Sequence, residues 1–178
     1  MAQDFKEMFQ KQEHCDVTLK VEGQEFKAHK NILSARSPVF SSTFRNEMKE
    51  KSSGVIEIED CDPSSFSDFL CFLYCAKIEN LTSENVFGLF TTADKYDVQD
   101  LRSECLEFMK KNLSVDTFCE TVTVAIQHLE KELLDLTTDF FAKHLEEIIV
   151  TVKWQRFVME NPIQGNEIMI KSLVSKKK

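Results

Sequence analysis

The 178-residue chain has few of the residues that build tight turns and linkers, with four glycines and three prolines. This shortage disfavours an all-β sandwich or barrel, because many short strands need frequent turns. The sequence contains no apolar run of the roughly 18 residues that a membrane span needs, and no segment with the form of a signal peptide. We therefore expect an intracellular protein, in the nucleus or the cytoplasm, with reduced cysteines and no membrane partner.

Motifs of common enzyme and metal sites are also missing. The sequence has no Gly-x-Gly-x-x-Gly, Walker, Gly-x-Ser-x-Gly or His-Glu-x-x-His motif, and its six cysteines form no Cys-x-x-Cys pair. His14 and Cys15 could be imagined as a base and a nucleophile, but neighbours on a strand point to opposite faces. We expect no catalytic site, no metal and no cofactor, and we interpret His29 as a structural histidine.

Positive charge is scarce except at the C-terminal end. The net charge of the chain is −8, with −12 in residues 1–152 and +4 in residues 153–178. An acidic body binds phosphates poorly, so no nucleic-acid partner is expected. The tail that ends at Lys178 is interpreted as a solvated terminus, with a nucleic-acid arm or a nuclear address as the alternative.

The strand patterns that are present all lie near the N-terminus. Val17–Val21 and Phe26–Ala28 flank a turn at Gly23, and Val55–Ile58 is a third short strand. Later segments have helical spacing, and Phe66–Tyr74 is so apolar that we expect burial on more than one side. Three short strands cannot form a large sheet. The pattern therefore predicts an α+β fold, with a small sheet covered by helices and an all-helical segment after it.

The helical part of the sequence predicts a domain boundary. Helical spacing over 115–127 and 130–145 follows a break at Asn112–Ser114. We therefore divide the chain into a first domain, 1–112, and a helical second segment, 113–178.

Two apolar features suggest contact with other proteins. Phe5, Met8 and Phe9 form a narrow stripe at helical spacing, which can pack either on the chain's own body or on a partner. Met48 stands alone among charged residues. Methionine is a poor side chain for solvent and an adaptable anchor in a partner's pocket, although Met48 could also fold back on its own helix.

Several stretches resemble a known family. Three stretches are similar to the core of a BTB (POZ) domain: Cys15–Leu19, Gly23–Lys30 and Ile32–Phe40. Three later stretches are similar to the speckle-type POZ group: Phe72–Tyr74, Ala93–Tyr96 and Asn112–Val115. The resemblance runs in order over nearly all of residues 1–175. It implies the BTB/POZ fold, a small sheet flanked by helices, followed by a short BACK-type helical segment at 113–178.

The resemblance also implies a function. Family members form homodimers and bind cullin-3, presenting substrates to a ubiquitin ligase that supplies the chemistry. By position, the residues that resemble the dimer surface are Phe5, Met8, Phe9 and Ile32. Ile170 lies where the speckle-type group uses its last helix as a second dimer contact, which would extend assembly beyond pairs.

The cullin contact of the family can be carried over to four positions. Met48-Lys49-Glu50 resembles the hydrophobic-x-Glu motif, in which Met48 would fill an apolar cullin pocket and Glu50 would fix the loop or pair with a donor. Asp94 and Tyr96 resemble further parts of the same surface.

The sequence departs from the speckle-type pattern in two places. Met1 stands shortly before the first strand, so the MATH domain that recruits substrate in this group is not expected. The alternatives are then a self-association module that does not bind cullin, or a partner that heterodimerises with longer relatives and dampens them. The turn after Tyr74, where the family usually has glycine, contains Ala76 instead.

Overall fold

The structure, a computed structural model, describes residues 2–47, 54–78 and 80–175. The chain divides into two compact units, Met1–Cys105 and Leu106–Lys178, and helix α6 (Gln99–Lys111) runs across the division. The sequence placed a boundary slightly later, at Asn112–Ser114. None of the helices in the described ranges is long and apolar enough to cross a membrane.

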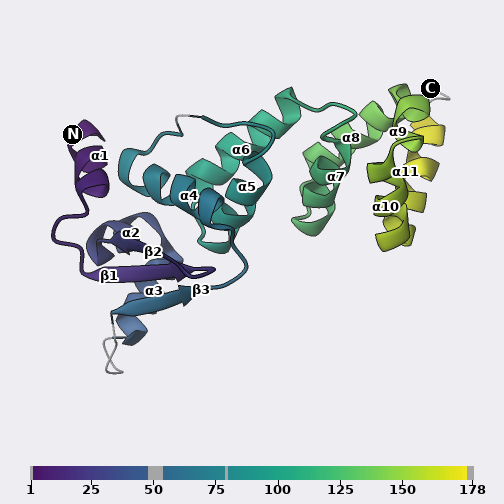
Figure 1. The fold of residues 1–178 in the computed structure, drawn as a ribbon. Coiled ribbons are helices and arrows are strands. Elements are labelled where there is room, and N and C mark those ends of the chain that lie inside the picture. Colours follow the sequence, from purple (N-terminus) through teal and green to yellow (C-terminus); the bar gives the residue numbers. More distant parts are fainter. Residues whose placement is uncertain (1, 48–53, 79, 176–178) are drawn as a thin grey trace. The chain divides into compact units, whose positions relative to one another are not determined.

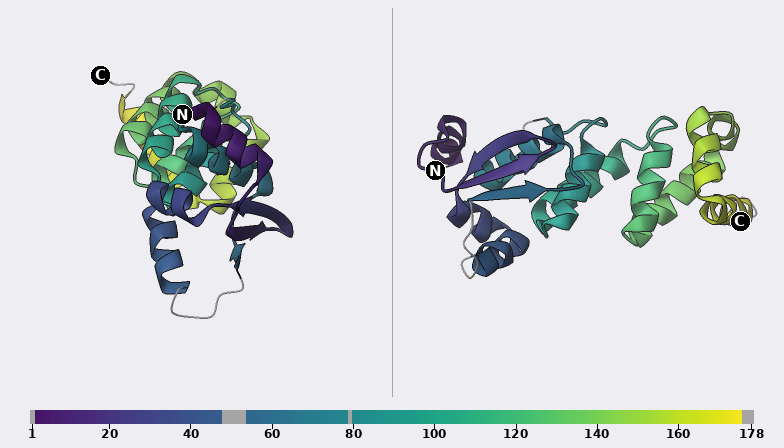
Figure 2. Two further views of the ribbon diagram at one scale, coloured as in Figure 1. Left: turned by 90° about the vertical axis from the view of Figure 1, so that its left-hand side faces the viewer. Right: turned by 60° about the horizontal axis from the view of Figure 1, so that its bottom comes forward.

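The first unit contains a three-stranded sheet with β1 in its centre (Figures 1 and 2). β1 (Val17–Val21) is antiparallel to β2 (Gln24–Ala28) and parallel to β3 (Val55–Ile58). The hairpin turns at Glu22 and Gly23, whose φ angles of 46° and 85° give the turn that suits two twisted strands. The predicted α+β class, with three short strands and many helices, is confirmed.

One face of this sheet is closed by α4 (Pro63–Cys75). Leu19 on β1 stands opposite Phe26 on β2 and Ile56 on β3, and it is fully buried. The Phe26 ring meets the Phe66 ring of α4 edge-on, with 5.5 Å between the centroids. The alternating apolar residues of the strands therefore pack on the helix that follows the sheet in sequence.

Helix α4 is the central helix of the first unit. It begins where Asp62 Oδ1 accepts the Ser65 N–H at 2.8 Å, with Pro63 in the first turn. Its buried side chains are Ser65, Phe66, Phe69, Leu70, Phe72, Leu73 and Tyr74. The expected burial on more than one side is thus confirmed. α5 (Val86–Lys95) approaches α4 closely at Gly88, where a Cβ atom would collide with the Ser65 side chain.

Three further helices complete the first unit: α1 (Ala2–Lys11), α2 (Lys30–Arg36) and α3 (Pro38–Glu47). α1 packs on α4, and α2 packs on both α3 and α4. Ser37 caps the start of α3, because its Oγ accepts the Phe40 N–H at 3.2 Å.

The C-terminal end of α4 is held by a residue in an unfavourable conformation. Ala76 has a φ of 53°, and its N–H donates to the Phe72 carbonyl at 2.8 Å. This left-handed position favours glycine, because any Cβ is strained there. We expect Ala76→Gly to raise the free energy of unfolding by about 0.5–1 kcal/mol. Urea denaturation followed by circular dichroism measures the change.

The control for this variant is Ala35→Gly, at an exposed position inside α2. There glycine has no strain to relieve and should lower the free energy of unfolding by roughly 0.5–1 kcal/mol. The same sign of change in both variants would contradict the assignment of strain to Ala76.

The second unit is entirely helical in its described part. Its helices are α7 (Phe118–Gln127), α8 (Lys131–Lys143), α9 (Leu145–Ile149), α10 (Val152–Glu160) and α11 (Pro162–Ser175). Its core is aromatic: Trp154 lies 4.7 Å from Phe141 and 5.5 Å from Phe157, between ring centroids. Lys153 Nζ ties α10 to α7 through the Glu120 carboxylate, at 2.9 Å.

Two predicted helices of this unit have different ends in the structure. The segment predicted as 115–127 becomes helical only at Phe118, because Ser114 and Thr117 hydrogen-bond each other in a turn before it. The segment predicted as 130–145 forms a helix only over Lys131–Lys143, and α9 follows His144 as a separate short helix.

Candidate interaction surfaces

The apolar stripe of α1 faces both the chain's own body and the outside. Phe9 packs on Tyr74 of α4, with 4.9 Å between ring centroids. Met8 is half-buried, and Phe5 is 39% exposed. Of the two uses left open by the sequence, Phe9 therefore serves internal packing, while Phe5 remains available to a partner.

Phe5 lies at the edge of an apolar hollow of about 370 Å³ in the first unit. Its lining residues are Phe5, Asn31, Ile32, Ala35, Arg36, Leu73, Tyr74 and Ala76. The structure thus brings together Phe5 and Ile32, two residues that the sequence placed on a dimer surface. An open apolar hollow of this kind is a feature that a partner chain can fill.

Arg36 gives the hollow a buried positive charge. Its guanidinium lies over the Phe72 ring, 5.7 Å from the centroid. Nε and Nη2 are buried and have no hydrogen-bond partner among the described residues. The contact with the aromatic ring offsets part of the cost of leaving these donors unpaired.

His29 ties the segment after α1 to the core. Its Nε2 donates to the Glu13 carbonyl at 2.8 Å, and its Nδ1 accepts from the Tyr74 hydroxyl at 2.8 Å. The same hydroxyl accepts the His29 backbone N–H at 3.0 Å. Burial raises the pKa of Tyr74 to about 12, so the hydroxyl keeps its proton for this bond. Every polar atom of the imidazole is therefore occupied structurally, as expected for this residue.

Among the described residues, His29 is the histidine near Cys15, and it is not available as a base. Cys15 Sγ lies 3.9 Å from His29 Nε2, but that nitrogen already carries the hydrogen donated to Glu13. Burial, followed by the nearby Asp16 charge, raises the pKa of the Cys15 thiol, which disfavours the nucleophilic thiolate. Within the described ranges, no three His, Cys, Asp or Glu side chains are grouped to hold a metal ion.

The residues predicted to contact cullin fall in two places. Met48 and Glu50 lie outside the described residues, directly after α3. Tyr96 is only 5% exposed, stacks on Phe40 at 4.5 Å between centroids, and has a pKa raised by burial to about 12. Its carbonyl accepts from Ser37 Oγ at 2.6 Å. The Tyr96 ring is therefore packed in the interior, and little of it is exposed to a partner.

Asp94 lies nearer the surface than Tyr96 does. Its Oδ1 accepts from Arg102 Nε at 2.8 Å, and the Arg102 guanidinium lies over the Phe90 ring at 5.1 Å. This ion pair joins the last turn of α5 to α6. The Asp94 carboxylate is thus held in one orientation by Arg102.

A family model described as the BTB/POZ domain matches residues 5–113. The chain belongs to the BTB/POZ domain family. The match includes the sheet, the α1 stripe, the hollow and the His29 network. BTB/POZ domains are protein-interaction modules that commonly dimerise, so residues 5–113 form a protein-interaction domain.

Individual relatives agree with the family. The chain is 34% identical over 163 residues to TD and POZ domain-containing protein 4 of Mus musculus, and 36% identical over 163 residues to protein 3 of that name. These alignments cover 91% of this chain, but only 44% and 45% of the relatives, which are thus more than twice the aligned length. The solved BTB domain of zebrafish PATZ1 is 28% identical, with a TM-score of 0.55, over 63% of this chain and 90% of that one.

The C-terminal unit continues beyond the BTB/POZ match. Ile170, predicted from the resemblance as a second dimer contact, is 62% exposed on α11. Ile163 and Leu173 are also exposed, at spacings of seven and three residues from it, so they share its helix face. The structure therefore places Ile170 in an apolar strip on the surface.

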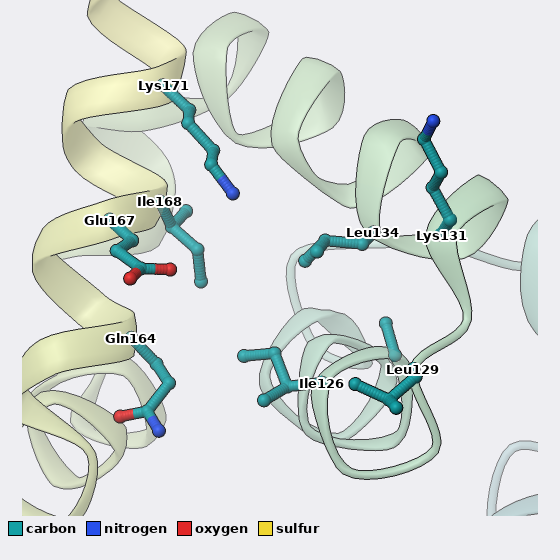
Figure 3. Close-up of a pocket in the computed structure, with 9 residues that line it drawn as sticks. Ile126, Leu129, Lys131, Leu134, Gln164, Glu167, Ile168 and Lys171 are labelled. Carbon is teal, nitrogen blue, oxygen red and sulfur yellow. The ribbon is translucent and has the colours of Figure 1, made fainter.

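A pocket in this unit was missed by the sequence reasoning. It has a volume of about 340 Å³ and lies between the turn joining α7 to α8 and the helix α11 (Figure 3). No sequence pattern indicated it, because the exposure of Leu129 in the turn between the two helices is visible only in the structure.

Proposed function

We propose that this BTB/POZ chain is a dimeric adaptor that docks on the N-terminal region of cullin-3 and presents another protein for ubiquitination. It has no part in the ligase chemistry itself. Within the family we assign it to the speckle-type POZ group, with 113–178 as a short BACK-type segment. The observation that carries the proposal is the Met48-Lys49-Glu50 sequence directly after α3 of a BTB/POZ domain.

The packing beneath the proposed cullin surface supports this assignment. Ser37 Oγ donates to the Tyr96 carbonyl, so the start of α3 is tied to the end of α5. Tyr96 stacks on Phe40 of α3, and Phe40 stacks in turn on Phe44, with 5.7 Å between centroids. A partner that contacts α3 and Asp94 would meet elements already fixed to one another, which lowers the entropic cost of binding.

The proposed homodimer forms through a different surface, which includes the apolar stripe of α1. Phe5 and Ile32 line one open hollow, whereas Met8 and Phe9 are partly covered by the chain itself. In a two-fold symmetric dimer each such residue contributes twice. The same hollow would accept a related BTB chain, so heterodimers with longer relatives are compatible with this proposal.

The test is light scattering on a sizing column, with and without the cullin-3 N-terminal region. A dimer that shifts to a complex of two chains with two cullin fragments supports the adaptor. A dimer that ignores the cullin fragment contradicts the adaptor and leaves the second candidate, a BTB self-association module. The hollow at Phe5 favours self-association under either candidate.

Met48→Asp is the single substitution that tests the proposed docking motif most directly. Burying a methionine side chain contributes about 1.5–3 kcal/mol, so we expect cullin-3 affinity to fall roughly ten- to one-hundredfold. Isothermal titration calorimetry measures this loss, and light scattering should still report a dimer.

The matched control is Met159→Asp, the same substitution at an exposed methionine of α10. It should leave cullin-3 affinity unchanged. If the Met48→Asp variant binds cullin-3 as tightly as the unaltered chain does, the assignment of Met48 to the cullin pocket is wrong, even if the dimer binds cullin-3.

A further inference from the structure

Arg36 is the one charged side chain among the described residues that line the hollow of the first unit. The hollow lies between α1, α2 and the C-terminal end of α4. Two of its lining residues are polar and uncharged. Asn31 accepts the Ile32 N–H through Oδ1 at 2.8 Å, and the Tyr74 hydroxyl is bonded to His29. The hollow therefore combines mostly apolar walls with a single positive charge.

The guanidinium of Arg36 lacks an acceptor. Nε and Nη2 are buried, and no described residue accepts a hydrogen bond from them. The Phe72 ring offsets only part of this cost, because a ring face replaces neither hydrogen bond. Arg36 is also the last residue of α2, where the helix dipole favours positive charge. That effect does not require burial, since an arginine extended into solvent supplies the same charge. The buried donors thus call for an acceptor that the single chain does not provide.

The lining indicates the chemistry of the missing partner group. A free anion such as phosphate would pair with the guanidinium but would leave the apolar walls uncovered. The occupant that fits both is a carboxylate beside an apolar side chain. Helix α1 presents this combination, because the exposed Asp4 precedes Phe5, which is 39% exposed at the edge of the hollow.

The same face of one chain therefore carries both members of a charge pair. A surface that pairs with its own copy must do so, because a two-fold axis makes every contact occur twice with the roles of the chains exchanged. Within one chain, Nε and Nη2 of Arg36 do not bond to Asp4. Pairing between two copies would add two ion pairs that the single chain lacks.

We propose that in the homodimer Phe5 of each chain enters the hollow of its partner, and that Asp4 of each chain pairs with the partner's Arg36. The guanidinium turns from the Phe72 ring toward the open hollow and presents Nε and Nη2 to that carboxylate. This assignment rests on the proposed homodimer and identifies the residues that select the partner. A related BTB chain is accepted when it carries a carboxylate at the position of Asp4 and a cation at that of Arg36, because a mismatched chain leaves a desolvated charge unpaired.

The test distributes the two charge reversals over separate chains. Arg36→Glu faces the partner's Asp4 with a like charge, so the dimer dissociation constant should rise at least roughly a hundredfold. Asp4→Arg faces the partner's Arg36 and should raise it at least about tenfold. In an equal mixture of the two variants both contacts again join opposite charges, so a heterodimer should form with close to the unaltered affinity. Native mass spectrometry distinguishes this heterodimer from either homodimer by mass, and sedimentation equilibrium gives the dissociation constants.

Glu7→Arg is the matched control, the same charge change at the other carboxylate of α1. Glu7 is exposed and pairs with Lys11 of its own helix at 3.6 Å. The variant should change the dissociation constant by less than about threefold, and it should not restore pairing when it is mixed with Arg36→Glu.

Two further measurements separate pairing from folding. Circular dichroism melting shows whether Arg36→Glu folds. If it does not, Arg36→Met keeps the apolar stem without the charge and should raise the dissociation constant at least about tenfold. Asp4 is exposed, so Asp4→Arg leaves the core intact and tests the pairing by itself.

Three results would overturn the pairing while the homodimer stands. They are an unaltered dissociation constant for Asp4→Arg, no heterodimer in a mixture of two folded variants, and equal rescue by Glu7→Arg. Loss of the dimer in Arg36→Glu that Asp4→Arg does not rescue would limit Arg36 to a structural role within its own chain. An unaltered chain that remains monomeric would overturn the homodimer together with the pairing. Failure of the pairing alone is therefore distinguishable from failure of the proposed function.

Discussion

Replacing Phe5 and Ile32 together by aspartate is expected to convert the proposed homodimer into monomers. Both side chains line the open hollow of the first unit, and neither is needed to close the core beneath it. Each buried side chain of this size contributes about 1.5–3 kcal/mol. A two-fold axis doubles the number of substituted positions in the interface, and the introduced carboxylates would also be desolvated there.

The expected size of this effect is a rise of at least roughly a thousandfold in the dimer dissociation constant, given the summed burial. Sedimentation equilibrium over a range of concentrations measures it. The control adds the same charge on exposed positions elsewhere, as Gln155→Asp with Ser103→Asp, and should remain dimeric. A Phe5/Ile32 variant that stays dimeric, with an unchanged melting curve, would show that the α1 stripe only packs internally.

Trp154→Ala is expected to cause the largest loss of stability among single changes in the second unit. The indole is 4% exposed and lies within 6.0 Å of Phe118, 4.7 Å of Phe141 and 5.5 Å of Phe157, between ring centroids. Truncation removes the common neighbour of three rings and leaves a large cavity. Substitutions of this kind cost about 3–5 kcal/mol.

Urea denaturation followed by far-ultraviolet circular dichroism measures this loss, since the chain's one tryptophan is removed as a fluorescent reporter. The control is Trp154→Phe, which keeps an aromatic ring among the three neighbours. It should lose about 1–1.5 kcal/mol. A loss below about 1 kcal/mol for Trp154→Ala would contradict the assignment of these rings as the core that holds α7, α8 and α10 together.

The elements that the sequence predicted correctly are those with a local signal. Alternation at Val17–Val21 predicted β1, and a glycine predicted the turn after it. Each signal lies within one turn or one strand. The apolar density of α4 also indicated its central position, because a helix buried on several sides cannot be amphipathic.

The features that the sequence did not predict depend on residues far apart in the chain, or on backbone strain that no sequence pattern indicates. His29 and Tyr74 are separated by 45 positions, and no local pattern announces their hydrogen bond. Tyr96 resembled a surface residue by family position, yet its ring is packed on Phe40. Leu129 occupies a helix end without the glycine that normally marks one, so the pocket beside it had no signature.

The bond between Ser37 and Tyr96 also has a consequence for the synthesis of the chain. The two residues are 59 positions apart. At the usual elongation rate of about 5–20 residues per second, α3 leaves the ribosome roughly 3–12 seconds before its acceptor exists. Phe40, which is almost fully buried in the folded protein, can stack on Phe44 but lacks Tyr96 throughout that interval. We therefore expect the apolar side chains of α3 to remain exposed on nascent chains, as a site for aggregation or chaperone binding, until α5 has been synthesised.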